Sequence, residues 1–98
     1  MKALVLKSPN EFGTEQVPDP EIGEGEILIR VKSCAICGTD IRILEGKKTR
    51  GVRYPSIIGH EIAGVIEDTR GSVGNLTKGT RVCIAPVIPC HSCRYCLE

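Results

Sequence analysis

The chain has 98 residues, which allows one domain with a modest hydrophobic core. Thirteen basic against twelve acidic side chains leave a formal charge of +1, so the composition does not favour a nucleic-acid or anionic-membrane surface. The N-terminal apolar stretch Ala3–Leu6 is too short for a signal peptide or a membrane span.

Short strands are expected along most of the chain, and no repeat, linker or low-complexity tract divides it. The clearest case is Glu26–Ser33, where apolar and polar residues alternate with a period of two. In chain order, the predicted elements are a strand over Lys2–Lys7, a turn over Asn10–Gly13, a strand over Thr14–Val17, a strand over Glu26–Ser33, a short helix over Asp40–Leu44, a strand over Glu61–Asp68 and a strand over Thr80–Val87. Short strands separated by Gly, Pro and Asn turns, with almost no helix, indicate an all-β barrel or sandwich.

Three cysteines at intervals of three, Cys90, Cys93 and Cys96, lie near the C-terminal end. Structural zinc takes four ligands in a tetrahedron, and closely spaced cysteines let one tight turn hold the ion. Because the fourth ligand is missing, we expect an incomplete metal site in a piece of a longer protein. The same spacing begins the ligand pattern of bacterial ferredoxins, so an iron–sulfur electron-transfer module is a rival hypothesis. His91, between the first two cysteines, is expected to be an exposed loop residue.

The cysteines are expected to be thiols and metal ligands rather than disulfides, as in a cytoplasmic protein, because no signal peptide precedes them. Cys34 forms a CxxC pair with Cys37, but no helix start or βαβ pattern supports a thioredoxin-like motif. We therefore expect Cys34 to be a small core residue. Cys83 lies within a predicted strand and is expected to pack there.

Several motifs occur in the order in which one enzyme family has them. Cys37-Gly38-Thr39-Asp40, followed by Tyr54–Val65, closely resembles the zinc-dependent medium-chain dehydrogenases, which include alcohol, sorbitol and threonine dehydrogenases. Lys78–Val82 resembles the family's Gly-Asp-Arg-Val turn, with Thr80 where Asp is usual, and Pro89–Cys96 resembles the start of its four-cysteine zinc lobe. The resemblance implies a mainly β fold: a GroES-like, partly open β-barrel over residues 1–98, with the cysteine-rich zinc lobe beginning within residues 89–98. It also implies a nucleotide-binding Rossmann domain, which these residues do not include.

The resemblance assigns a role to each motif residue. Cys37 and His60 would bind the catalytic zinc, Glu61 would be a ligand or near-ligand, and Thr39 would start the proton relay. Cys90, Cys93 and Cys96 would bind the structural zinc. The parent protein would be a cytoplasmic, homo-oligomeric alcohol or polyol dehydrogenase that passes hydride to NAD or NADP. Its partners would be small alcohols, without nucleic acid or membrane, and the 98 residues alone are expected to be inactive.

The residue types support these roles on chemical grounds. A catalytic zinc keeps three protein ligands and one open position, where it acts as a Lewis acid on a substrate oxygen. Cys37 and His60 are ligands suited to zinc, and a barrel can bring together loops that are 23 residues apart. The Thr39 hydroxyl could accept the proton of a bound alcohol, and Asp40 could hold the other ring nitrogen of His60.

One departure and one alternative remain open. The proton relay of the best-known members continues to a histidine five residues after the cysteine ligand, where this chain has Arg42. Arginine does not titrate usefully, so proton exit would need another group or water. The alternative is a GroES-like binding or assembly module without chemistry, although such a scaffold has no need of Cys37, Thr39, Asp40 and His60 together. The basic stretch that contains Lys47, Lys48, Arg50 and Arg53 is expected to be a solvated loop that could border the substrate cleft of a complete enzyme.

Overall fold

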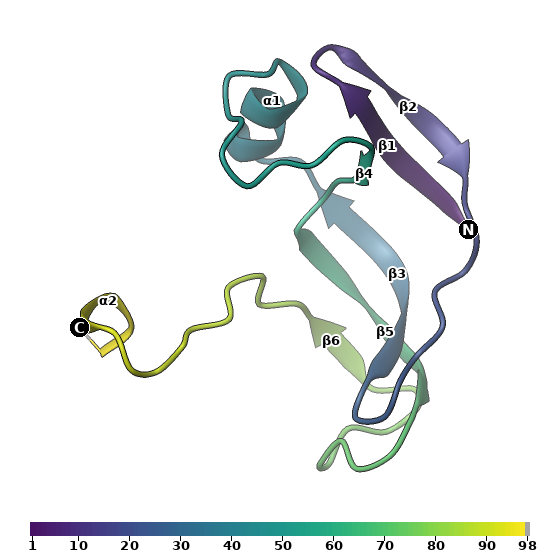
Figure 1. The fold of residues 1–98 in the computed structure, drawn as a ribbon. Helices are drawn as coiled ribbons and strands as arrows, with labels where there is room; N and C mark the ends of the chain where they lie inside the picture. The colour runs from purple at the N-terminus through teal and green to yellow at the C-terminus, as the bar shows by residue number, and fades with distance from the viewer. Residues whose placement is uncertain (98) are drawn as a thin grey trace.

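The computed structural model describes residues 1–97, which form two three-stranded antiparallel sheets and two short helices (Figure 1). The elements are β1 (Lys2–Ser8), β2 (Glu11–Gln16), β3 (Ile27–Ala35), α1 (Gly38–Leu44), β4 (Ser56–Ile57), β5 (Glu61–Thr69), β6 (Arg81–Cys83) and α2 (Arg94–Leu97). The strand order is β2-β1-β4 in the first sheet and β3-β5-β6 in the second. The chain is mainly β, as its sequence predicts.

The first sheet is built on the β1–β2 hairpin. Asn10 closes the turn with a left-handed φ of 63°, which asparagine tolerates better than most residues. Because the turn is completed there, β2 begins at Glu11, and Gly13 pairs with Val5. The predicted turn over residues 10–13 is therefore too long, and the returning strand starts three residues earlier than expected.

The second sheet is dominated by the long antiparallel pair β3–β5. The ladder runs from Ile27, opposite Thr69, to Ala35, opposite Glu61. Gly64 lies opposite Val31, and a side chain at Gly64 would collide with the carbonyl oxygen of Arg30. Only glycine lets the two backbones approach this closely. This ladder fixes which residues meet at each end of the sheet.

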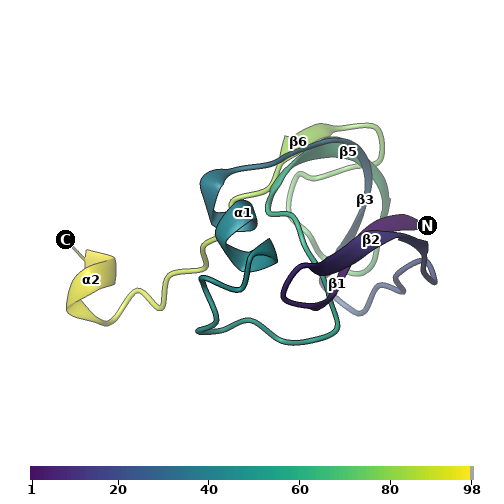
Figure 2. The ribbon, with the colours of Figure 1, turned by 90° about the horizontal axis from the view of Figure 1, so that it is seen from above.

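The apolar interior lies between the two sheets, and Figure 2 shows β1, β3 and β5 arranged around it. The buried apolar residues are Ala3, Val5, Leu6, Leu44 and Ile66. A cavity of about 690 Å³ remains between the sheets. No strand pairing joins the two sheets within residues 1–97, so the barrel is open there.

Helix α1 is held at its C-terminal end by the turn of the first hairpin. The N–H group of Asn10 donates to the carbonyl oxygen of Leu44 at 2.7 Å. Gly46 has a φ of 71°, and a Cβ atom there would lie 2.7 Å from the Cβ atom of Pro9. Glycine thus ends the helix and also makes room for the hairpin turn.

Several expectations for single elements and residues were wrong. The strand predicted over Thr80–Val87 is only three residues long: the last hydrogen bond to β5 is donated by Ile84, and Pro86 has no N–H group to donate. Cys34 and Cys83 were expected to be packed, but both are exposed. Each lies at or near the end of its strand. The sequence also gave no sign of β4 or α2, which are two and four residues long.

Beyond β6, residues 84–97 extend away from the barrel and end in α2 (Figure 1). Ile88 and Tyr95 are both 93% exposed. Neither helix in the described part of the chain is long and apolar enough to cross a membrane.

Candidate metal centres

The first candidate centre begins at the N-terminus of α1, where Cys37 is the capping residue. The backbone N–H of Thr39 donates to Cys37 Sγ at 3.3 Å. In return, the N–H of Cys37 donates to Asp40 Oδ2 at 3.0 Å. This reciprocal pair resembles a capping box, with a sulfur atom in place of the usual hydroxyl. It fixes the position of the thiol and of the carboxylate together.

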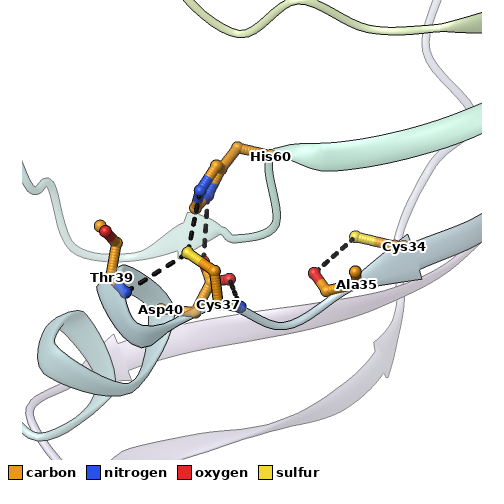
Figure 3. A network of polar contacts seen from close by, with 6 residues as sticks. All are labelled: Cys34, Ala35, Cys37, Thr39, Asp40 and His60. Carbon is orange, nitrogen blue, oxygen red and sulfur yellow. Dashed lines mark hydrogen bonds and ion pairs between the residues drawn. The ribbon is translucent and has the colours of Figure 1, made fainter.

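His60 reaches the same place from the start of β5. Gly59, just before it, has a φ of 117°, which only glycine adopts readily. The last ladder pair of β3 and β5, Ala35 with Glu61, brings the two ligand segments to one end of the second sheet. As a result, His60 Nε2 lies 3.2 Å from Cys37 Sγ (Figure 3).

Asp40 lies behind the histidine ring and is only 3% exposed. Its Oδ1 atom is 3.2 Å from His60 Nδ1. No well-aligned hydrogen bond reaches this oxygen, and it is the one such buried side-chain oxygen within residues 1–97. Because an unpaired buried carboxylate oxygen is costly, Asp40 favours the tautomer of His60 that carries its proton on Nδ1. That tautomer leaves the Nε2 lone pair facing Cys37, as a metal ligand requires.

Glu61 completes the first cluster. One ligand atom each from Cys37, His60 and Glu61 lies within 4.8 Å of the others. A sulfur and a nitrogen on one tetrahedral zinc would be roughly 3.6 Å apart, so the observed 3.2 Å needs only a small adjustment. A thiol, an imidazole and a carboxylate are all donors that zinc takes. The residues therefore fit a zinc ion.

Two further residues of the sequence motif lie on α1. Thr39 is exposed, and Figure 3 shows its side chain beside Cys37 on the first turn. Arg42 is exposed in the last turn, where its carbonyl oxygen accepts the N–H groups of Lys47 and Lys48. Arg42 is not a member of the ligand cluster in the described part of the chain.

The second candidate centre contains the three C-terminal cysteines. Cys96 Sγ lies 3.6 Å from Cys90 Sγ and 3.4 Å from Cys93 Sγ. These distances are far longer than a disulfide bond and close to the roughly 3.8 Å between two sulfurs on one tetrahedral zinc. The three thiols fit three positions of such a site. His91 is exposed with a φ of 55° and is outside the cluster, as expected.

Hydrogen bonds already favour the anionic form of one of these thiols. The pKa of Cys90 is lowered to about 6, chiefly by the Ser92 hydroxyl and further by the backbone N–H groups of Ser92 and Cys93. The hydroxyl of Ser92 and the N–H of Cys93 each lie 3.4 Å from Cys90 Sγ. Because zinc binds thiolate rather than thiol, these donors prepare Cys90 as a ligand.

Sequence reasoning missed two residues that shape these centres. Gly59 supplies the backbone conformation that directs His60, and the Gly-His-Glu order was a usable signal for it. Ser92 supplies a hydrogen bond to Cys90, and no sequence signal separated it from an ordinary loop serine.

Comparison with known proteins identifies the family. Residues 23–98 match the family model described as the alcohol dehydrogenase GroES-like domain. The chain belongs to this family. Sorbitol dehydrogenase of Bombyx mori is 39% identical to it over 97 residues, which are 96% of this chain and 29% of that protein. Acryloyl-coenzyme A reductase of Sulfurisphaera tokodaii is 37% identical over 97 residues, or 98% of this chain and 29% of that protein.

A solved structure supports the fold. A zinc-binding dehydrogenase of Sinorhizobium meliloti 1021, solved with bound NADP, superposes with a TM-score of 0.86 at 32% identity. The match covers 98% of this chain and 28% of that one. The resemblance to zinc-type medium-chain dehydrogenases and the GroES-like, mainly β fold with open sheets are thus confirmed. Neither the assembly module nor the iron–sulfur module is favoured by these relatives. The chain spans less than a third of the length of the relatives it matches.

Proposed function

We propose that this GroES-like chain is the N-terminal part of the catalytic domain of a zinc-dependent alcohol or polyol dehydrogenase. The observation that carries the proposal is the meeting of Cys37 Sγ and His60 Nε2 at 3.2 Å, with Glu61 in the same cluster and Asp40 behind the ring. A scaffold without chemistry would not need a buried carboxylate directed at that histidine.

Each residue of the first cluster has a role in this proposal. Cys37, His60 and Glu61 hold the catalytic zinc, which supplies Lewis acidity toward the substrate oxygen when bound. Asp40 keeps the His60 ring in one orientation and one tautomer. The Thr39 hydroxyl would relay the proton of the alcohol: it would accept that proton while passing its own to another group or to water. A bound oxidised nicotinamide would accept the hydride, and the alcohol carbon would become a carbonyl carbon.

The rest of the proposal concerns the whole enzyme. Cys90, Cys93 and Cys96 hold three positions of a structural zinc. A Rossmann domain outside these residues would bind NAD or NADP. The relatives, each more than three times as long, leave room for such a domain, and the solved Sinorhizobium relative carries NADP. We also propose a cytoplasmic homo-oligomer acting on small alcohols or polyols, without nucleic-acid or membrane partners.

Metal content and turnover of the complete protein test this function together. Cys37→Ser and His60→Ala should each lower zinc content and abolish alcohol oxidation with NAD and NADP. Cys83→Ser is the matched control, because Cys83 is exposed at the end of β6 and outside both clusters. Full zinc content and full turnover in the His60→Ala variant would disprove the assignment.

A further inference from the structure

The segment from Arg42 to Arg53 carries an excess of positive charge that the rest of the chain does not share. Residues 42–53 contain five basic side chains and one acidic, whereas the remaining residues contain eight basic and eleven acidic. Lys47 Nζ pairs with Glu45 at 2.7 Å, and Lys48 Nζ donates to the Arg50 carbonyl at 3.4 Å. Within residues 1–97, no ion pair or hydrogen bond engages the guanidinium groups of Arg42, Arg50 and Arg53.

One of these arginines lines a hollow next to the first metal centre. The hollow has a volume of about 330 Å³, and its wall includes Gly59, the residue directly before His60. Its apolar lining consists of Ile43, Val52, Ile57 and Ile58. Arg53 is the one charged residue of the lining, and Ser56 adds a hydroxyl group.

A guanidinium without a partner in a mostly apolar hollow suits an anionic ligand. Its fixed fork of N–H donors matches the two oxygens of a carboxylate or phosphate. Arg53 is exposed, so solvent would partly screen its bond to an anion, and this bond should weaken as the salt concentration rises. The loop that carries Arg53 runs from the end of α1 to β4, and the chain then continues directly to His60 (Figure 1). An anion bound there would lie beside the site where the hydroxyl is oxidised.

We propose that Arg53 recognises a carboxylate or phosphate group on the substrate alcohol itself. The inference rests on the proposed dehydrogenase function and narrows its substrate class to anionic alcohols, such as hydroxy acids and phosphorylated polyols. Arg53 then sets specificity, while Cys37, His60 and Thr39 act on the hydroxyl. The phosphates of the nucleotide are the other source of an anion near this loop, so the test must separate the two.

The test compares matched alcohols that differ only in an anionic group, using the complete zinc-loaded protein. In Arg53→Gln, the ratio of kcat/KM for the anionic alcohol to that for the neutral alcohol should fall by roughly 10- to 100-fold. Arg53→Lys should recover part of this ratio relative to Arg53→Gln, because lysine keeps the positive charge but lacks the paired N–H donors of the guanidinium group. Arg50→Gln is the control, because Arg50 is on the same loop but outside the hollow; its ratio should stay within about twofold of the wild type.

Three results would overturn the proposal. An unchanged ratio in Arg53→Gln, or equal losses for both alcohols, would show that Arg53 does not read the substrate charge. A raised KM for NAD or NADP with an unchanged ratio would assign the anion to the nucleotide.

A third measurement does not depend on turnover: calorimetry should show binding of inorganic phosphate that weakens at least tenfold in Arg53→Gln. Equal phosphate binding by the two proteins would also overturn it. If no alcohol is oxidised, the proposed function fails, and phosphate binding still decides whether Arg53 forms an anion site.

Discussion

The two candidate metal centres are built in opposite ways. In the first, Cys37 and His60 are 23 positions apart and come from a helix start and a strand start that the β3–β5 ladder brings together. In the second, Cys90, Cys93 and Cys96 lie on one short segment beyond the barrel, where Cys90 and Cys93 are exposed and Cys96 is partly buried. Strand pairing brings the residues of the first centre together, whereas the second centre has no strand pairing to hold it; we therefore expect a bound ion to order the second more than the first. The predictions below test this contrast.

The largest expected effect separates chemistry from metal binding within the first centre. Thr39→Ala should reduce turnover of the complete protein by roughly 10²- to 10⁴-fold, because it removes the hydroxyl that we propose as the start of the proton relay. Zinc content should stay unchanged, because Thr39 contributes only its backbone N–H to Cys37. Thr39→Ser retains the hydroxyl and should keep most of the activity. Full turnover in Thr39→Ala would remove Thr39 from the mechanism.

The support behind the first centre can be removed without touching a ligand. Asp40→Asn should weaken zinc binding at the first centre by roughly 10- to 100-fold, because the amide no longer fixes the His60 tautomer. Competition with a chelator would measure this loss. Zinc at the second centre should be unaffected, since Asp40 makes no contact there. A parallel loss at both centres would indicate general unfolding instead.

Metal removal should distinguish the two centres directly. After chelation, hydrogen exchange in residues 90–97 should accelerate by about tenfold or more, because little else orders this segment. Exchange in β3 and β5 should change little, because their ladder does not involve the metal. Metal analysis adds a second check: the 98-residue chain should bind at most one zinc, and the complete enzyme two. Two tightly bound zinc ions in residues 1–98 alone, or iron with sulfide, would contradict the ligand assignment.

The smallest effect concerns the reactivity of the thiols in the metal-free lobe. Since the pKa of Cys90 is about 6, most of this thiol is ionised at pH 7, and its alkylation should slow as the pH falls through 6. Ser92→Ala removes the main donor, so the pKa should rise and alkylation at pH 7 should slow by about twofold. Mass spectrometry of iodoacetamide-treated protein measures both rates. Alkylation of Cys90 that is insensitive to both changes would argue against the Ser92 contact.

The sequence predicted those parts of the molecule in which a local pattern and the tertiary structure agree. β1, β3 and β5 have apolar alternation and a defined partner, and their positions were correct to within two residues. The proximity of Cys37 and His60 also followed, through the resemblance to a family. The spacing of these two residues in the sequence does not predict that they meet, whereas the family resemblance does.

Errors arose where the outcome depends on what lies across from a residue. Cys34 and Cys83 were expected to be packed, but both are exposed in the structure. The end of β6 is set by its partner strand β5. The N–H of Ile84 still donates a hydrogen bond to the carbonyl oxygen of Ile62, but the residues after Ile84 do not pair with β5. The pattern of apolar and polar residues along the sequence does not show which residues will be neighbours in the folded chain.

The final ladder pair of β3 and β5 has a consequence for how such enzymes can diversify. Because Ala35 and Glu61 are paired, the two ends of the intervening segment are fixed whatever its length. Doubling a flexible loop costs only about 0.6 kcal/mol of closure entropy. The loop with Arg53 can therefore lengthen, shorten or change its charge while Cys37 and His60 stay in register. Under the proposal that Arg53 recognises the substrate, selection can exchange one substrate for another here without rebuilding the candidate metal centre.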